Sequence, residues 1–490
     1  MKFSDRVSLQ TTAPLVECLQ SLSQQPKTPF YAPGHKQGQG ISPNLKQWLG
    51  KAIFTADLPE LPEFDNLFAP QGVIAEAQAL AAQAFGAEQT WFLVNGSTCG
   101  VVAALLATCN PGDKLILPRN SHQSAIAGLV LSGAVPIFIN PEYDPHRDLA
   151  LNVTPTAVQA ALNAHPDSKA VFLVNPTYQG ICGDIAAIAS IVHQSHLPLI
   201  VDEAHGAHFT FHPDLPPAAL SVRADLAIQS THKVLGAMSQ ASMLHQQGDR
   251  VSPQRIRQAL QFVQSTSPNA LLLASLDAAR QQMATEGQAL MAQTLQSSDR
   301  ARHEIAQIPG LSVLNPPDSP QPGFAALDRT RLTVWVDKLG LTGFEADEIL
   351  NEQLNIVAEL PLLRHLTFMI TLGNTEADII ALCQGFLTLA QRPQTPLSLD
   401  AVPFPATLPQ LALTPREAFF APTETISSQN ARDRISAELI CPYPPGIPVL
   451  MPGEVITDRA ITDLQQILAC GGQITGCSDP TLNTLRVVKA

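Results

Sequence analysis

The middle of the chain alternates short apolar runs with helical patterns, and this alternation limits the possible folds more than any other feature. Parallel strands are joined by crossover helices, so the alternation is typical of an α/β fold with a parallel sheet. We therefore predict a large α/β domain whose sheet is mostly parallel. Its expected strands cover residues 91–94, 114–117, 135–139, 170–174, 197–201 and 224–229.

Polar residues follow several of these strands, at the edge of the sheet where ligands usually bind. Asp202 follows the strand at 197–201, and Lys233 follows the strand at 224–229. A lone lysine after a strand is usually a solvated loop charge. An acid and a lysine at two strand ends instead fit a site for pyridoxal 5′-phosphate (PLP). Lys233 would carry the Schiff base, and Asp202 would hold the pyridinium nitrogen protonated.

The turn at residues 95–98, Asn-Gly-Ser-Thr, opens a helix and is a candidate phosphate cup. Backbone N–H groups and the helix dipole favour an anion there, and the hydroxyls of Ser97 and Thr98 add donors. Taken alone, the turn is more often an ordinary helix cap. With Asp202 and Lys233 also at strand ends, the phosphate cup becomes the favoured interpretation. The turn is not a Walker loop, because the Gly-Lys-Ser/Thr ending is missing.

The composition excludes several classes of protein. A net charge of −13 argues against nucleic-acid binding, which needs clustered lysine and arginine. Eight cysteines without CxxC spacing fit a reducing cytoplasm better than a disulfide framework or a zinc site. His205 and His208 lack a third ligand of suitable spacing, so we expect no metal. No signal peptide and no apolar run of about 18 residues is recognisable. We predict a cytoplasmic protein that does not enter membranes.

Several motifs along the chain belong together. They are Ala32-Pro33-Gly34-His35-Lys36, Asn95-Gly96-Ser97-Thr98, Pro176-Thr177-Tyr178-Gln179-Gly180, Asp202-Glu203-Ala204-His205-Gly206, Ser230-Thr231-His232-Lys233, Ser265-Thr266-Ser267-Pro268, Tyr443-Pro444-Pro445-Gly446 and Pro452-Gly453-Glu454. This set resembles the ornithine/lysine/arginine decarboxylases, which are PLP enzymes with the aspartate aminotransferase type of fold. The chain length resembles the short members of the family. One departure is Gln123, where many relatives have a lysine after the histidine.

The resemblance implies a role for each matching residue. Lys233, His205 and Asp202 would be catalytic, with Lys233 or His205 as the proton donor to the product. His122 would stack on the cofactor ring, and Thr177 would lie under the cofactor edge. The implied cofactor-binding residues are Ser97, Thr98, His122, Thr177, Asp202, His205, Ser230, His232 and Lys233. Within this set, Ser97, Thr98, Ser230 and His232 would bind or brace the phosphate.

The resemblance also implies decarboxylation of a basic L-amino acid in polyamine biosynthesis. Arginine, giving agmatine, is favoured, while lysine, giving cadaverine, and ornithine, giving putrescine, stay open. Glu454 is our candidate for the acid that meets the cationic tail of the substrate. We expect a homodimer or a multiple of dimers, in which residues 265–267 reach the phosphate of the neighbouring subunit.

Two alternatives remain. One is another PLP transferase or lyase on the same fold, such as an aminotransferase. That enzyme would need an arginine for the α-carboxylate, and no local pattern identifies one. The other is a non-catalytic regulatory relative, against which the presence of both Asp202 and Lys233 speaks.

A chain of 490 residues is too long for one ordinary core. Proline-rich patches at 315–320 and 392–396 mark loops or boundaries beyond the large domain. Strand patterns at 332–336 and 366–371 predict a small α+β domain, and a second α+β region follows from about residue 414. The predicted parts are an N-terminal helix and active-site loop segment at 1–50, a PLP-binding large domain at 51–300, a small α+β domain at 301–395 and a C-terminal α+β domain at 410–490.

Overall fold

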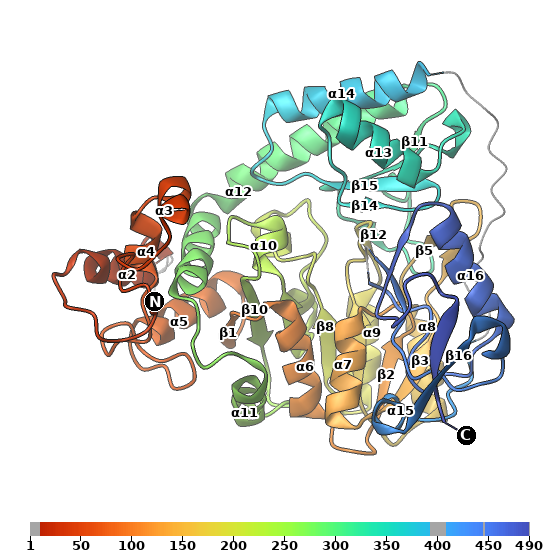
Figure 1. Cartoon of the computed structure of the whole chain (residues 1–490), viewed down its shortest axis with the longest axis horizontal. Helices are drawn as coiled ribbons and strands as arrows, with labels where there is room; N and C mark the ends of the chain where they lie inside the picture. Colours follow the sequence, from red (N-terminus) through yellow and green to blue (C-terminus); the bar gives the residue numbers. More distant parts are fainter. Residues whose placement is uncertain (1–9, 393–407, 444–445, 490) are drawn as a thin grey trace. The chain divides into compact units, whose positions relative to one another are not determined.

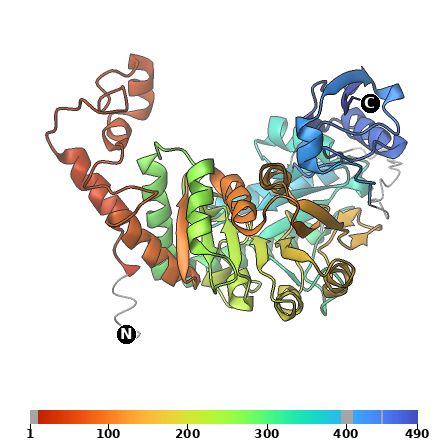
Figure 2. The same cartoon turned by 90° about the horizontal axis from the view of Figure 1, so that it is seen from below.

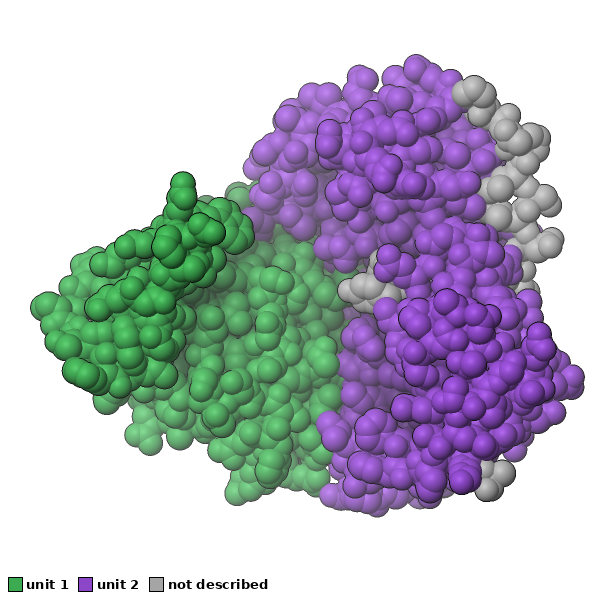
Figure 3. Space-filling view, viewed as in Figure 1, with its two compact units in different colours: residues 1–107, 201–291 green, residues 108–200, 292–490 purple. Residues whose placement is uncertain are grey.

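The computed structural model describes residues 10–392, 408–443 and 446–489. Residues 393–396 of the second proline-rich patch, together with Pro444 and Pro445, lie outside these residues. The chain divides into two compact units (Figure 3). Unit 1 comprises residues 1–107 and 201–291, and unit 2 comprises residues 108–200 and 292–490.

The strands of unit 1 lie in the order β1 (Gln89–Leu93), β10 (Ser242–Gln246), β9 (Leu226–Gln229) and β8 (Leu199–Asp202). The unit boundary crosses β8, so that only its last two residues, Val201 and Asp202, belong to unit 1. β10 is antiparallel to both of its neighbours, β1 and β9. The sequence did not predict this strand, because Ser242, His245 and Gln246 break its apolar pattern although all five of its residues are buried.

Two short helical segments follow the strands of unit 1 (Figures 1 and 2). α6 (Gly96–Thr108) follows β1, and the turn between them requires a φ of +74° at Gly96. Gly100 lets α6 approach the strands, since an added Cβ there would lie 2.6 Å from Leu93 Cδ1 and 2.9 Å from Ile228 Cγ2. α10 (Thr231–Val234) is a single turn that follows β9. Unit 1 also contains the helices α2 (Pro14–Gln24), α3 (Pro43–Leu49), α4 (Ala52–Ala56), α5 (Val73–Phe85) and α11 (Pro253–Val263).

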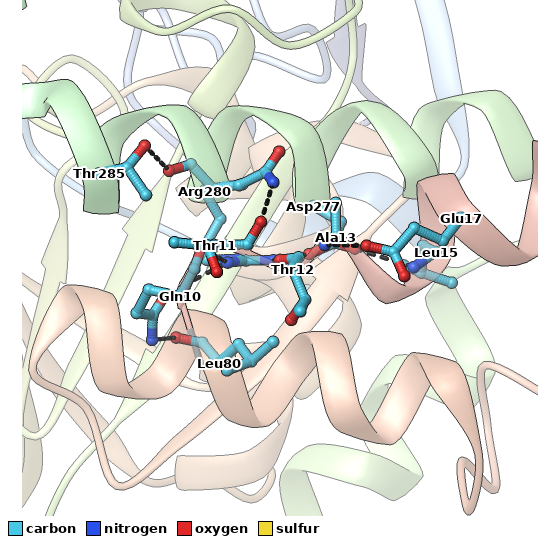
Figure 4. Close-up of polar contacts among 11 residues, drawn as sticks. Gln10, Thr11, Thr12, Ala13, Leu15, Glu17, Leu80, Asp277, Arg280 and Thr285 are labelled. Atoms are coloured by element: carbon cyan, nitrogen blue, oxygen red, sulfur yellow. Dashed lines mark hydrogen bonds and ion pairs between the residues drawn. The ribbon is translucent and has the colours of Figure 1, made fainter. Parts of the chain in front are cut away.

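The N-terminal segment of unit 1 is fixed to α12 (Ala270–Ala306) by a buried ion pair (Figure 4). Arg280 is bound to Asp277 on the preceding turn of the helix, and both side chains are fully buried. Arg280 also donates to the carbonyl oxygens of Gln10 at 2.9 Å and Thr12 at 2.7 Å, while Asp277 accepts the N–H of Leu15 at 2.9 Å. The ion pair therefore satisfies the backbone groups that precede and begin α2.

We expect Arg280→Met to destabilise the protein by about 3 kcal/mol or more, because it leaves the Asp277 carboxylate buried without its cation. Urea unfolding of the variant measures this loss. Arg300→Met is the matched control on α12, since Arg300 pairs with Glu304 at the exposed surface and its removal should change stability little. Equal effects of the two substitutions would contradict the structural role of Arg280.

The parallel strands of unit 2 are β6 (Ser168–Val174), β2 (Lys114–Pro118) and β3 (Val135–Ile139), in that order. β2 pairs in parallel with both neighbours, as the alternation of strands and helices predicted. The helices between these strands are α7 (Gln123–Ser132) and α8 (Pro155–Ala164), and α9 (Ile185–Gln194) follows β6 and precedes β8. Short two-residue strands accompany them: β4 (Tyr143–Asp144), β5 (Leu149–Ala150), β7 (Ile181–Cys182) and β12 (Ala326–Leu327).

Two α+β regions complete unit 2, in agreement with the predicted fold class. The first has the antiparallel strands β11 (Ser312–Val313), β13 (Arg331–Trp335), β15 (His365–Met369) and β14 (Leu360–Pro361), with α13 (Gly343–Leu354) and α14 (Glu376–Ala390) on a shared apolar core. The second has the strand pairs β16 (Thr423–Ser427) with β19 (Thr484–Val488) and β17 (Cys441–Tyr443) with β18 (Gln473–Thr475), besides α15 (Pro415–Phe420) and α16 (Asp458–Ala469). The domain boundaries at residues 50, 300 and 410 stay predictions.

In the described part of the chain, no helix combines the length and the apolar character that crossing a bilayer requires.

Candidate active site

Lys233 lies on α10, directly after β9, and its side chain contacts a histidine from the end of β8. Its Nζ is 3.0 Å from Nε2 of His205. A charged lysine can only donate, so the ring nitrogen of His205 is placed to accept this bond. The single turn of α10 is closed by the Leu235 N–H, which donates to the Thr231 oxygen at 2.9 Å. A lysine and a histidine at this distance can exchange a proton directly.

Asp202 is the last residue of β8, and its carboxylate is 6% exposed. Burial is the largest influence on this group and raises its pKa to about 6. The positive charge of Lys233 and the Ala204 N–H, which donates to Oδ1 at 3.2 Å, both act in the opposite direction. Asp202 is therefore a buried acid whose negative charge depends on a cation or a donor close by.

Hydroxyl groups gather where α6 and α10 begin. Ser230 donates to Ser97 across the two segments, with 2.7 Å between the two oxygen atoms. Thr231 is fully buried, and its hydroxyl has no hydrogen-bond partner among the described residues. Thr98 is exposed at the first turn of α6. Unpaired N–H groups of the α6 N-terminus add to these donors, so the cluster can hold a phosphate group.

His232 faces the loop that precedes β10. Its Nδ1 lies 3.0 Å from the carbonyl oxygen of Ala241, to which it donates. Burial lowers the pKa of this ring, so the neutral form prevails at neutral pH. This contact holds the loop that precedes β10. The predicted task of His232, to bind or brace the phosphate, stays a prediction.

Unit 1 thus fits PLP through its own residues. The paired hydroxyls of Ser97 and Ser230 lie where α6 begins and suit a phosphate, and Asp202 is a buried acid that suits a protonated ring nitrogen. Lys233, 3.0 Å from His205, would supply the amine. In the described part of the chain, no group of three or more metal-binding side chains occurs.

The predicted residues His122 and Thr177 belong to unit 2. His122 caps α7, and its Nδ1 accepts the Ser124 N–H at 3.2 Å, which leaves Nε2 as the protonated nitrogen. Thr177 is buried, and its hydroxyl accepts the Ile181 N–H at 3.1 Å. Both are therefore held in fixed orientations within their own unit. Their contacts with the cofactor stay predictions.

Glu454, the predicted substrate acid, is buried rather than open at a loop surface. It is 2% exposed, and Arg119 contacts its Oε2 at 3.1 Å. The Met451 N–H donates to the same oxygen at 2.9 Å. Burial raises the pKa of Glu454, and the charge of Arg119 opposes that effect. The carboxylate already holds its own loop together, so a contact with substrate stays a prediction that needs a separate test.

A chain of hydrogen-bonded, buried polar residues lies next to Asp202 and was not predicted from the sequence. Glu203 follows Asp202 and accepts a hydrogen bond from Gln229 on β9, with 2.7 Å between Oε2 and Nε2. Gln229 in turn contacts His245 on β10, which contacts Thr90 on β1. Polar residues inside otherwise apolar strands were the available signal, because buried polar groups need partners.

Residues 265–267 are exposed, and the Ser265 N–H donates to Asn95 Oδ1 at 3.1 Å within unit 1. This bond links the segment to the turn that opens α6. Their predicted contact with a neighbouring subunit stays a prediction.

Comparison with known proteins places this site in a family. The family model for the major domain of Orn/Lys/Arg decarboxylases matches residues 13–323, and the model for their C-terminal domain matches residues 401–474. An arginine decarboxylase of Bacillus subtilis is 38% identical over 488 residues, which is 98% of either chain. The lysine decarboxylase LdcA of Pseudomonas aeruginosa is 25% identical and is matched over 92% of this chain and 75% of its own.

The fold agrees with these sequence matches. The crystal structure of the lysine decarboxylase LdcF of Francisella novicida superposes with a TM-score of 0.84 at 21% identity, over 97% of this chain and 81% of that one. The resemblance drawn from the motifs is confirmed. The chain belongs to the Orn/Lys/Arg decarboxylase family.

Proposed function

We propose that this protein is a PLP-dependent decarboxylase of a basic L-amino acid, with L-arginine as the preferred substrate and agmatine and CO₂ as products. The name of the 38% identical Bacillus relative supports arginine. The lysine decarboxylase relative keeps lysine as the second candidate, and the family description keeps ornithine as the third. The same chemistry would place the enzyme in polyamine biosynthesis.

The observation that carries this proposal is the meeting of Lys233, His205 and Asp202 at the ends of β8 and β9. When bound, PLP supplies an electron sink for the two electrons that the departing carboxylate leaves behind. Asp202 would hold a proton on the ring nitrogen, which requires its buried negative charge. Lys233 and His205, 3.0 Å apart, would hold the proton that the product carbon receives.

The hydroxyl cluster has the complementary task of positioning. Ser97, Thr98, Ser230 and His232 would bind or brace the phosphate, and this fixed anchor would orient the reacting bond relative to the cofactor ring. Which bond breaks depends on that orientation, so an aminotransferase remains the alternative on the same residues.

The decisive experiment incubates the PLP-loaded enzyme with L-arginine, L-lysine and L-ornithine and measures CO₂ and the amine product. We expect arginine to give the highest kcat/KM. Formation of a 2-oxo acid without CO₂ would support the aminotransferase, and a PLP-loaded enzyme inert towards all three would support a regulatory relative.

The substrate role of Glu454 has its own test. If Glu454 meets the cationic tail, Glu454→Gln should raise KM about tenfold, a loss of about 1.4 kcal/mol of charge-assisted bonding, with kcat less affected. Glu438→Gln is the matched control, because Glu438 is a buried acid of the same unit bound to Ser478 and to the Arg486 N–H. A KM for each basic amino acid within twofold of wild type would assign Glu454 to the fold alone, as its bond to Arg119 suggests.

We further propose that the enzyme acts in the cytoplasm as a homodimer or a multiple of dimers. None of the eight cysteines, all of which lie in the described residues, forms a disulfide, in keeping with a reducing compartment. Large apolar side chains are exposed on the segment that leads into α3 and on α3 itself, including Phe30 at 92% and Trp48 at 79%. Such side chains are typical of an interface. Sedimentation at 52.4 kDa alone would contradict a dimer.

A further inference from the structure

Glu203 is fully buried, and within the described part of the chain its carboxyl group is hydrogen-bonded to neutral groups only. Its Oε1 accepts the N–H of Ala219, in the 3₁₀ helix Ala219–Val222, at 2.7 Å, and its Oε2 lies 2.7 Å from the Gln229 amide nitrogen. An ionised carboxylate buried with only neutral partners is costly, whereas the protonated acid is not. The next carboxylate along the chain, Asp202, adds a like charge and makes ionisation of Glu203 harder still.

The hydrogen-bond chain beyond Glu203 can serve either protonation state. His245 is fully buried, with Nε2 3.0 Å from Gln229 Oε1 and Nδ1 2.8 Å from the Thr90 hydroxyl. With Glu203 ionised, Thr90 donates to His245, His245 donates to Gln229, and Gln229 donates to Glu203. With Glu203 protonated, the acid donates to the amide oxygen of Gln229, and the amide and the ring reverse their roles. His245 is neutral in both states.

We propose that Glu203 is a positioning residue that is a neutral carboxylic acid in the folded protein, so that Asp202 keeps the negative charge beside Lys233. Two ionised carboxylates in sequence would raise each other's pKa and would weaken Asp202 as an anion. Glu203 and its proton lie in a site that is fully buried. The hydrogen-bond chain from Glu203 to Thr90 links the end of β8 to β9, β10 and β1. The benefit to the cofactor rests on the proposed function; the protonation state does not.

The titratable groups around Glu203 allow a pH test. Along the chain the neighbour is Asp202, at the end of β8, and through Gln229 the neighbour is His245, whose pKa burial lowers to about 3. The 3₁₀ helix presents only the Ala219 N–H. Burial is the largest influence on Glu203 and raises its pKa to about 8. An acid whose pKa is raised by folding binds more protons in the folded protein than in the unfolded chain. Between pH 4.5, its pKa in the unfolded chain, and about pH 8, its pKa in the folded protein, a rise in pH therefore lowers the stability of the protein.

The substitution Glu203→Gln mimics the neutral acid, because its amide can accept the Ala219 N–H and donate to Gln229. The experiment measures Tm of the cofactor-free protein and of this variant at pH 6, 7.5 and 9. We expect the Tm of the variant relative to wild type to rise by about 3 °C between pH 6 and pH 9, since only wild type has a buried acid to ionise. A difference that stays constant over this range would show an acid ionised throughout and would overturn the proposal.

His245→Phe is the control for a purely structural role. It breaks the chain but keeps Glu203, so it should lower Tm at every pH without removing the loss of stability at high pH. If His245→Phe and Glu203→Gln change the pH profile alike, the chain is structural and the proposal is wrong. Because the protein carries no cofactor in these measurements, a failed assignment of PLP or of the substrate would leave their outcome unaffected.

Discussion

Lys233→Ala should abolish CO₂ release from every basic amino acid and, in the same variant, the covalent fixation of PLP by borohydride. Both depend on one amine at the end of β9, since borohydride traps the bond between that amine and the cofactor. The loss of turnover should reach the detection limit, because the substitution removes the amine that lies 3.0 Å from His205. Mass analysis of the reduced protein locates the labelled peptide.

Lys36→Ala is the matched control, since Lys36 belongs to the motif at residues 32–36 and its ammonium group contacts the Tyr31 carbonyl oxygen. It should keep both the label and measurable turnover. Recovery of PLP-labelled peptide from Lys233→Ala would place the attachment site elsewhere. Lys233→Arg adds a second check, because it keeps the positive charge beside Asp202 without a nucleophilic amine.

The apolar strands were predictable because their signal is local. The expected strand at 135–139 coincides with β3, and those at 114–117 and 170–174 fall within β2 and β6. Since parallel strands end at one edge of a sheet, the strand-end residues Asp202 and Lys233 could be picked out together. β10 escaped notice because Ser242, His245 and Gln246 are polar yet buried, and a pattern of apolar residues cannot mark such a strand.

The surroundings of the site residues could not be predicted, because they depend on distant partners. Glu454 was expected to be an accessible loop acid, but it is bound to Arg119, 335 residues earlier in the chain. The surroundings of Glu203 could not be predicted for the same reason. Its hydrogen-bond chain runs through residues of β9, β10 and β1, and no spacing in the sequence indicates that these residues meet. Burial and pairing of polar groups follow from tertiary packing, which a single sequence does not display.

Asp202→Asn is expected to keep PLP bound while kcat falls about a thousandfold, because a neutral amide cannot hold the ring nitrogen protonated against the buried surroundings. The substitution preserves the size of the side chain, and its oxygen can still accept the Ala204 N–H. Binding through the hydroxyl cluster and Lys233 remains. Turnover within tenfold of wild type would contradict the task assigned to Asp202.

Stability separates this loss of function from damage to the fold. The pKa of Asp202, raised to about 6 by burial, means that the folded cofactor-free protein binds more protons than the unfolded chain between pH 3.8 and about 6. Stability therefore falls as pH rises through that window, and above pH 6 the full cost of a buried negative charge is present. Asp202→Asn removes that cost, so the cofactor-free variant should unfold at a higher Tm than wild type at pH 7.5. Asp225→Asn, which leaves the ion-pair partner Arg250 without its acid, should instead lower Tm. An Asp202→Asn variant that is more stable and nearly inactive would show that the charge of Asp202 lowers stability but is needed for the reaction. A lower Tm for Asp202→Asn would instead show that Asp202 stabilises the fold.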